Sequence, residues 1–536
     1  MERITIHSLA ADTSITVWWE KPVLPPKGYN IFLNGQLAQT TSRTHATLTG
    51  LEPDTEYEVR LVMQRTEAAQ MPESTAASEP EAARRTVSAP MEDTRNEKLQ
   101  KNGNGVGTSA VIRTQAVRRR LDVTKAPYYA KGDGMTRNTA VLQQALDDCG
   151  PGDCVYIPAG VFLTGALRGH SDVEIYLEEG AVLQGTDAIE DYLPRIPSRF
   201  EGMEMECYSS VLNFGTLDHN GGPNCHNVWI HGRGTIASGG KTLAWRIIED
   251  ERERLKDDLE ALGDLVKECE NDNTIPGRVR PRLINLSNCR KVRISGLTLQ
   301  NGASWNLHMI YCKEITTDHC VFRSEGVWNG DGWDPDSSEN CTLFAAKFYT
   351  GDDAVAIKSG KNPEGNQINR PTRHIRVFDC YSAFGHGICI GSEMSGGVED
   401  VKIWDCDLAQ SQNGLEIKAT KKRGGYVRNV TVQDCTLPRI MMHSVGYNDD
   451  GIGAPVPPVF ENCLFERLKL LGRYQDADGD GSMKPCAAIE LAGFDAPGHE
   501  LRKVTFRDIA LTGEGMQTIQ LQWCDGVRME NISVKG

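Results

Sequence analysis

A short alternation of apolar and polar positions recurs along the second half of the chain. Most copies carry apolar residues at their first, third and eighth positions, and four carry cysteine at the sixth. The copies start at Val292, Ile315, Ile375, Val401, Val430, Val504 and Val527. Apart from two longer gaps of 60 and 74 residues, successive starts lie 23 to 29 residues apart, the period of a structural repeat that buries its apolar face only against its neighbours. With Gly, Asn and Asp at the corners, this strand-like period predicts parallel coils of a β-solenoid.

The repeat also accounts for the positions of several cysteines. The chain contains 16 cysteines, and Cys320, Cys380, Cys406 and Cys435 occupy the same repeated position. We therefore expect them to stack as small apolar side chains inside the coils. Because no CxxC pair occurs, we predict no metal site and no cofactor.

Two other patterns mark the ends of the solenoid. After Gly132–Asn138, the residues Val141, Leu142, Ala145, Leu146 and Cys149 share one helical face, which predicts a helix that caps the first coil. Residues 1–88 alternate as short strands, and Leu51–Val59 is similar to the tyrosine corner of a fibronectin type III β-sandwich, with Tyr57 at the corner. Polar residues with Gly103, Gly105 and Gly107 predict a linker at 89–110, and the solenoid is expected at 111–536.

Two segments fall outside these patterns. Residues 247–270 keep apolar positions at helical spacing within a strongly charged stretch, which predicts an amphipathic helix outside the coils. It could pack on the flank of the solenoid, cover a groove or contact a second copy. Residues 476–481 are similar to the start of a calcium-binding loop, but the twelfth position is Ala487 in place of Glu, so we interpret them as a loop.

Composition limits the setting. At 536 residues, two domains are expected, and 39% hydrophobic content without a long apolar run excludes a membrane span. With a net charge of −15, we expect no nucleic-acid partner and no membrane partner. The first residues lack a secretory signal pattern, and many unpaired cysteines favour a reducing compartment. We therefore expect a cytoplasmic protein, or a secreted or periplasmic one if the chain is a processed form. The oligomeric state is left open.

Candidate chemistry is concentrated in three short segments. Asp331 lies in Asn329–Asp334, the adjacent Asp352 and Asp353 follow Gly351, and His386 lies between two glycines. Crowded carboxyl groups raise one another's pKa, so a protonated acid and a carboxylate base can coexist near neutrality. Glycoside hydrolysis needs such a pair. Asp331 and Asp352 are about 21 residues apart, close to one coil, so we expect them on neighbouring rungs.

These segments resemble the polygalacturonases, family 28 of the glycoside hydrolases. The similarity covers Asn329–Ser337, Gly351–Gly360 and Gly385–Ser392 and extends over about residues 111–536. It implies an all-β fold, a right-handed parallel β-helix of the pectin-lyase type behind the small β-sandwich. It also implies inverting hydrolysis of α-galacturonosidic bonds. By resemblance, Asp352 is the general acid, Asp331 and Asp353 hold and activate the attacking water, and His386 lies beside the acid.

The residues expected to bind substrate include one departure from the family pattern. The resemblance assigns contacts with a pectic polysaccharide or oligogalacturonide to Asn329, Lys358, Lys418 and Arg423. Where the family has Arg-Ile-Lys, this chain has Glu416-Ile417-Lys418, which removes one carboxylate clamp. Lys421, Lys422, Arg423 and Arg428 could compensate, because a local basic run attracts an anionic sugar.

Several functions remain open at this stage. The segment Lys361–Gln367 resembles the longer loops of exo-acting members, which close one end of the groove, so we expect release of sugars from a chain end. A hydrolase of another pectic linkage, such as rhamnogalacturonan, is the first alternative. A pectate lyase and a non-catalytic carbohydrate-binding solenoid are the others.

Overall fold

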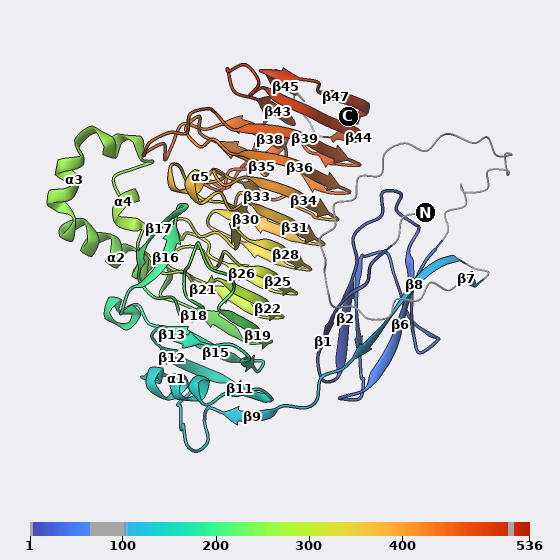
Figure 1. Ribbon diagram of the computed structural model, residues 1–536, viewed down its shortest axis with the longest axis vertical. Coiled ribbons are helices and arrows are strands. Elements are labelled where there is room, and N and C mark those ends of the chain that lie inside the picture. The colour runs from blue at the N-terminus through green and yellow to red at the C-terminus, as the bar shows by residue number, and fades with distance from the viewer. Residues whose placement is uncertain (1–3, 65–100, 103–104, 513–518, 536) are drawn as a thin grey trace. The chain divides into compact units, whose positions relative to one another are not determined.

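The computed structural model describes residues 4–64, 101–102, 105–512 and 519–535 (Figure 1). They divide into two compact units, Met1–Arg118 and Arg119–Gly536. No helix in the described ranges is long and apolar enough to cross a membrane.

The first unit is a β-sandwich of two antiparallel sheets. One sheet contains β1 (His7–Ala10), β2 (Ser14–Trp18) and β5 (His45–Thr49), and the other contains β3 (Tyr29–Leu33), β4 (Gln36–Thr41), β6 (Glu56–Met63), β7 (Lys101–Asn102) and β8 (Gly105–Arg113). Trp19 is fully buried in its core. The Tyr57 hydroxyl accepts a hydrogen bond from the Glu52 N–H at 2.9 Å, which is the bond of a tyrosine corner.

The boundary between the two units differs from the predicted one. Strand β8 pairs along β6 from Glu56↔Arg113 to Val62↔Gly107, so residues 105–113 belong to the sandwich, and the division falls after Arg118. The prediction of a linker reaching residue 110 and a solenoid starting at 111 was therefore wrong at this end. Gly105 and Gly107, which we had interpreted as linker residues, lie within strand β8. Most of the predicted linker lies outside the described residues.

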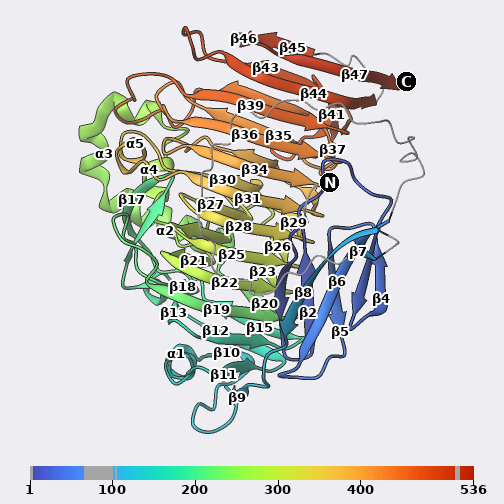
Figure 2. The ribbon, with the colours of Figure 1, turned by 45° about the vertical axis from the view of Figure 1, so that its right-hand side comes forward.

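The second unit is a parallel β-helix whose coils contribute to three sheets. Figures 1 and 2 show the coils stacked in chain order from α1 to β47. One sheet has eight strands: β10 (Asp133–Arg137), β12 (Gly160–Thr164), β15 (Ala181–Gly185), β20 (Thr235–Ala237), β23 (Thr298–Gln300), β26 (Val321–Arg323), β29 (Lys347–Tyr349) and β32 (Tyr381–Phe384). A second has 11: β13 (Leu167–Gly169), β18 (Leu212–Phe214), β21 (Ile284–Ser287), β24 (Leu307–Ile310), β27 (Trp333–Asp336), β30 (Asp353–Ile357), β33 (Gly387–Ile390), β35 (Gly414–Ala419), β38 (Ile440–Ser444), β43 (Ile489–Ala492) and β45 (Ile519–Gln522).

The third sheet has 16 strands: β9 (Arg119–Asp122), β11 (Asp153–Ile157), β14 (Glu174–Leu177), β19 (Cys225–Gly232), β22 (Cys289–Ser295), β25 (Lys313–Asp318), β28 (Glu339–Phe344), β31 (Thr372–Phe378), β34 (Val398–Trp404), β36 (Tyr426–Gln433), β37 (Thr436–Leu437), β39 (Val459–Glu466), β40 (Lys469–Leu470), β44 (Leu501–Thr512), β46 (Cys524–Asp525) and β47 (Arg528–Lys535). Two hairpins, β16 (Ile196–Phe200) with β17 (Met203–Cys207) and β41 (Arg473–Gln475) with β42 (Met483–Pro485), lie outside these sheets.

Each coil turns between two sheets at a single residue with positive φ. The values are 55° at His319, 50° at Asp379, 55° at Asp405 and 53° at Asp434. Asp and Asn tolerate this left-handed conformation better than most residues, which explains their place in the repeat. The next residue in each case is Cys320, Cys380, Cys406 or Cys435, and all four are buried. The predicted interior stack of cysteines is confirmed, and the 16 cysteines, all of them within the described ranges, form no disulfide.

The predicted capping helix is also confirmed. Helix α1 (Thr139–Asp147) buries Leu142, Ala145 and Leu146, and Cys149 follows it into the same core. An amphipathic helix at this position covers the apolar end of the first coil, which would otherwise face water.

The charged insertion forms several short helices instead of one. Helix α2 (Gly240–Arg254) is followed by α3 (Lys256–Leu262), the 3-10 helix η3 (Gly263–Glu268) and α4 (Thr274–Gly277). Helix α2 packs Leu243, Ala244 and Ile247 against the solenoid core, whereas α3 has no buried residue. The flank-packing interpretation therefore holds for α2 alone. The remaining helices are α5 (Glu364–Ile368) and the 3-10 helix η2 (Ile189–Tyr192).

We predict that Ile294→Ala, in β22, lowers the free energy of unfolding of the β-helix unit by about 2–4 kcal/mol, because a fully buried side chain would leave a cavity. The control is Arg290→Ala on the same strand, which removes an ion pair to Glu314 that is partly exposed and should cost less than about 1 kcal/mol. Urea unfolding midpoints measure both. Equal losses would contradict an interior position for Ile294.

Candidate active site

The predicted catalytic residues lie at or just before the starts of three neighbouring strands of the 11-stranded sheet. Strand β27 pairs with β30 at Trp333↔Val355, β30 pairs with β33 at Asp353↔Gly387, and β33 pairs with β35 at Cys389↔Glu416. Since parallel strands stack about 4.8 Å apart, this register brings the starts of β27, β30 and β33 together. The expectation that Asp331 and Asp352 belong to neighbouring rungs is confirmed.

The pleat of this sheet separates core from cleft. Along β35, Leu415, Ile417 and Ala419 enter the hydrophobic core, so Glu416 and Lys418 project from the opposite face. Both line a cleft with a cavity volume of about 290 Å³. The outer face of the sheet is therefore the floor of this cleft.

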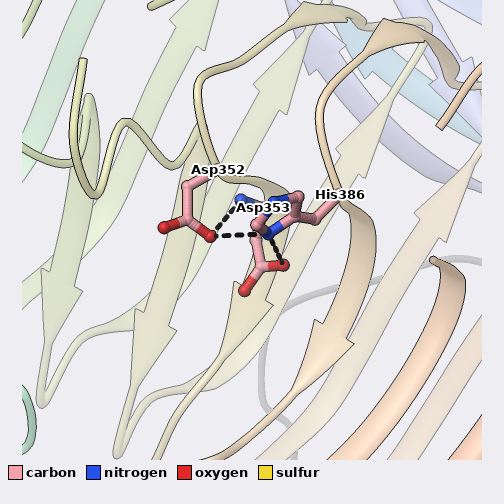
Figure 3. Close-up of side chains that lie close together, drawn as sticks. All are labelled: Asp352, Asp353 and His386. Atoms are coloured by element: carbon pink, nitrogen blue, oxygen red, sulfur yellow. Dashed lines mark hydrogen bonds and ion pairs between the residues drawn. The ribbon is translucent and has the colours of Figure 1, made fainter. Parts of the chain in front are cut away.

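Asp352, Asp353 and His386 form a compact group on this floor (Figure 3). His386 Nδ1 lies 3.0 Å from Asp352 Oδ1 and 3.8 Å from Asp353 Oδ1. The backbone supports the contact, because the His386 N–H donates to the Asp352 carbonyl at 3.0 Å. The preceding Gly385 has φ of 103°, and a Cβ there would meet Thr350 Oγ1 at 2.4 Å. Only glycine fits the turn that carries the histidine.

The three carboxyl groups of the site differ in their pKa. Burial raises the pKa of Asp353 to about 6. Burial and then the charge of Asp352 raise the pKa of Asp331 well above its usual value. Burial opposes ionisation of Asp352 too, but the charge and hydrogen bond of His386 outweigh it and lower the pKa to about 2. Asp352 is therefore ionised beside the His386 imidazolium, whereas Asp331 and Asp353 take up a proton more readily.

Two of the residues expected to bind substrate lie beside this group. Lys358 Nζ is 3.7 Å from Asp331 Oδ2, 3.2 Å from Glu393 Oε2 and 5.0 Å above the Trp305 ring. Burial opposes its charge, but Glu393 and Asp331 raise its pKa well above the usual value. Asn329 lines the cleft, and its Oδ1 accepts from Arg280 at 2.6 Å.

Glu416, which replaces the family arginine, faces the cleft and pairs with Lys418. Lys418 Nζ lies 3.1 Å from Glu416 Oε2 and 4.0 Å from Asp353 Oδ2. His443 Nε2 contacts the other oxygen of Glu416 at 2.7 Å, and Asn413 donates to Oε2 at 3.0 Å. Burial opposes ionisation of Glu416, but Lys418 and His443 lower its pKa strongly. The lysine therefore already has a carboxylate partner within the cleft.

Arg423 does not line the cleft, contrary to its predicted contact with substrate. Its guanidinium is fully buried and donates to the Ser392 and Asn448 carbonyls and to Asn362 Oδ1. Because Ser392 and Asn448 both line the cleft, Arg423 supports the wall from behind. Lys421, Lys422 and Arg428 are not among the residues that line the cleft either. Lys422 pairs with Glu268, and Arg428 pairs with Glu399.

One wall of the cleft consists of segments that are far apart in the chain. Arg278, after α4, contacts Glu201 of the β16–β17 turn at 2.8 Å and Asp450 of the loop after β38 at 2.9 Å. Lys361 also pairs with Asp450. The Glu270 N–H donates to Asn448 Oδ1 at 2.8 Å. This network fixes Glu201, Glu270, Tyr447 and Asn448 at the cleft.

Residues 361–367, the loop that was expected to close the groove, contact this wall from behind. Glu364 accepts from the Glu204 N–H of β17 at 2.9 Å. Among the described residues, none of 361–367 lines the cleft.

Sequence reasoning missed several residues of the cleft, notably Glu201, Glu270, Gln412, Tyr447 and Asp478. Glu270 lies at the end of the charged insertion, and Asp478 lies in the segment 476–481 that we had interpreted only as a loop. Both come from outside the repeat, so the periodicity that located the other residues gave no signal for them. Glu393 follows the His386 segment directly and could have been included with it.

Comparisons with known proteins agree with this architecture. Residues 255–447 match the family model "Glycosyl hydrolases family 28", and residues 2–79 match "Fibronectin type III domain". A probable polygalacturonase of Vitis vinifera is 31% identical over 318 residues, 57% of this chain and 58% of that protein. The exo-poly-α-D-galacturonosidase of Dickeya chrysanthemi is 26% identical over 425 residues, 75% of this chain and 68% of that protein.

Two solved structures share the fold. A family 28 exopolygalacturonase of Yersinia enterocolitica matches with a TM-score of 0.76 and 21% identity, covering 100% of this chain and 98% of that one. An exopolygalacturonase of Thermotoga maritima matches with a TM-score of 0.63 and 24% identity, covering 78% of this chain and 92% of that one.

Proposed function

Because the chain carries a glycosyl hydrolases family 28 domain behind a fibronectin type III domain, we propose that it hydrolyses α-1,4-galacturonosidic bonds of pectin or oligogalacturonides, with inversion and from a chain end. The observation that carries the proposal is the contact of His386 with Asp352 at 3.0 Å, beside two further carboxyl groups on adjacent coils. Such a group combines a proton donor with carboxylates that can activate water.

In the proposed reaction, Asp352 passes the proton that it shares with His386 to the glycosidic oxygen while water attacks the anomeric carbon from the opposite face. Asp331 and Asp353 hold that water, and one of them accepts its proton. The bond from the anomeric carbon to the leaving oxygen breaks as the bond to the water oxygen forms, so the configuration inverts. Because the pKa of Asp353 is about 6, this base is ionised only above that pH. Activity should therefore fall as the pH drops below about 6.

The shape of the cleft supports action at a chain end. Its volume of about 290 Å³ lies at the lower end of the range for small-molecule sites and is small for a groove that holds many sugar units. The wall formed around Arg278 and Asp450 limits one side of it. The Dickeya chrysanthemi relative is itself an exo-poly-α-D-galacturonosidase.

Charge favours a second candidate, a hydrolase of another pectic linkage. Eight carboxylic acids line the cleft against two lysines and one histidine, and both lysines already contact carboxylates. A substrate with a carboxylate on every sugar would find few free cations. One with a neutral sugar at the Glu416 subsite, as in rhamnogalacturonan, would meet hydrogen-bonding groups instead.

The state of the cysteines bears on the cellular location. The 16 cysteines, which all lie within the described residues, form no disulfide, so we propose a reducing compartment in which the enzyme acts on short oligosaccharides. A secreted or periplasmic enzyme acting on polymer is the alternative.

We predict that Asp352→Asn reduces kcat on oligogalacturonides to below about 1% of wild type without changing thermal stability, because the amide keeps the shape but cannot donate a proton. Asp379→Asn makes the same chemical change at a coil corner with positive φ, where Asn is tolerated, and should retain activity. Assays by reducing-sugar release, with melting curves for both variants, decide the matter. Substantial turnover by Asp352→Asn would remove the acid role from Asp352.

We also predict the identity of the first product. Inversion of an α-linkage gives the β-anomer, and action at a chain end gives one short uronide from the start of the reaction. Proton NMR in the first minutes should show β-anomeric signals, and chromatography should show a single product size. An α-anomer would contradict inversion, whereas a ladder of oligomers would contradict exo action. An unsaturated product absorbing in the ultraviolet would indicate a lyase.

Substitutions at Lys418 and Glu416 test whether this pair binds a substrate carboxylate. If Lys418 binds a substrate carboxylate, Lys418→Ala should lower kcat/KM on oligogalacturonides by about 2–4 kcal/mol of transition-state stabilisation. It should affect methyl-esterified oligomers little. Glu416→Gln should raise kcat/KM on the charged substrate, because it frees the lysine while keeping the hydrogen-bonding shape. Equal losses on both substrates for Lys418→Ala, together with a loss for Glu416→Gln, would favour the neutral-sugar subsite.

A further inference from the structure

We propose that Asp478 is a positioning residue for the proton-donating pair Asp352–His386, binding the Nε2–H of His386 so that Nδ1 holds the proton shared with Asp352. The inference rests on the proposed function and extends it to a residue outside the repeated coils.

Asp478 reaches the histidine from the turn between β41 and β42. Its two carboxylate oxygens lie 3.0 and 3.1 Å from His386 Nε2, on the side of the ring opposite Asp352. Its side chain is 61% exposed, whereas that of His386 is 16% exposed. Each ring nitrogen thus contacts a different carboxylate.

Gln412 holds this turn in place. Its Nε2 donates to Asp478 Oδ2 at 2.7 Å, and its Oε1 accepts the backbone N–H groups of Ala477 and Asp478 at 2.7 and 3.2 Å. The Gln412 N–H in turn donates to the carbonyl of Gly385 at 2.8 Å. Gln412 therefore links the Asp478 carboxylate to the turn that carries His386. This link favours a defined position for Asp478 over a chance surface contact.

The double contact decides which nitrogen carries which proton. A neutral imidazole has one N–H and one acceptor nitrogen. With the N–H of Nε2 donated to Asp478, Nδ1 is left to accept from a protonated Asp352 or to donate to an ionised one. A single proton then lies between Nδ1 and Asp352, 3.0 Å apart. It leaves to the glycosidic oxygen and is replaced from solvent after each turnover.

The charge of Asp478 also sets the pH range of this proton. Burial disfavours the imidazolium, but Asp352 and Asp478 raise the pKa of His386 well above its usual value. The other charged groups that act on the pair are Asp353, Asp331, Lys418 and Lys358 and, near Asp478, Glu270. A higher pKa means that the pair keeps its proton to higher pH. Removing the charge of Asp478 should therefore move the alkaline limb of the activity profile to lower pH.

The test compares three variants in kcat/KM profiles against pH on oligogalacturonides. Asp478→Asn should move the alkaline limb down by about one pH unit, with about tenfold lower activity above it. The acidic limb, set by Asp353, should move little. Asp478→Glu should restore most of the shift. Asp480→Asn removes a carboxylate from the same turn whose contacts are with its near neighbours Ser482 and Lys484, and it should leave both limbs in place.

A second measurement works without turnover. In full-length protein with 15N-labelled histidine, the His386 ring signals are assigned by their loss in His386→Gln. In wild type and Asp480→Asn the ring should stay doubly protonated to higher pH than in Asp478→Asn.

The outcomes separate the two proposals. An unmoved alkaline limb and unchanged His386 titration in Asp478→Asn, or equal shifts in Asp480→Asn, would overturn the role of Asp478. If wild type hydrolyses no pectic oligomer, the proposed function fails, and the NMR titration still decides whether Asp478 controls the protonation of His386.

Discussion

The in-register stacking of parallel coils is the constraint on which the rest of this structure depends. At four corners, His319, Asp379, Asp405 and Asp434 have positive φ, and the cysteine that follows each of them enters the core. With the corners fixed, a strand cannot slip by one position without moving its apolar side chains to the surface. The same register places Glu416 and Lys418 on the outer face of β35 and aligns the starts of β27, β30 and β33. The core thereby builds the floor of the active site.

Electrostatic compensation is the second requirement. Buried carboxyl groups in one small cleft disfavour one another's ionisation, so each ionised group needs a cationic or hydrogen-bonding partner. Asp352 has His386, Glu393 has Lys358, and Glu416 has Lys418. Asp353 lacks so close a partner, and burial raises its pKa to about 6. The proton shared by Asp352 and His386 and the ionised form of Asp353 above that pH together provide an acid and a base.

Segments inserted between the coils decide how much of the floor a substrate reaches. The network around Arg278, Glu201 and Asp450 joins the β16–β17 hairpin, the helical insertion and the loop after β38. The hairpin β41–β42 brings Asp478 to the other nitrogen of His386. The repeated coils thus supply the proposed reacting groups, while the insertions shape access and tune the protonation of those groups.

The sequence by itself determined the two-domain plan, the coil register, the capping helix and the position of Asp331, Asp352, Asp353 and His386 on neighbouring rungs. All of these follow from local periodicity, which repeats with the coil and so translates directly into position. Only the tertiary structure placed β8 in the sandwich, buried Arg423 behind the wall and brought Glu270 and Asp478 to the cleft. The physical reason is that these contacts join segments far apart in the chain, through ion pairs and loop geometry that leave no periodic trace in the sequence.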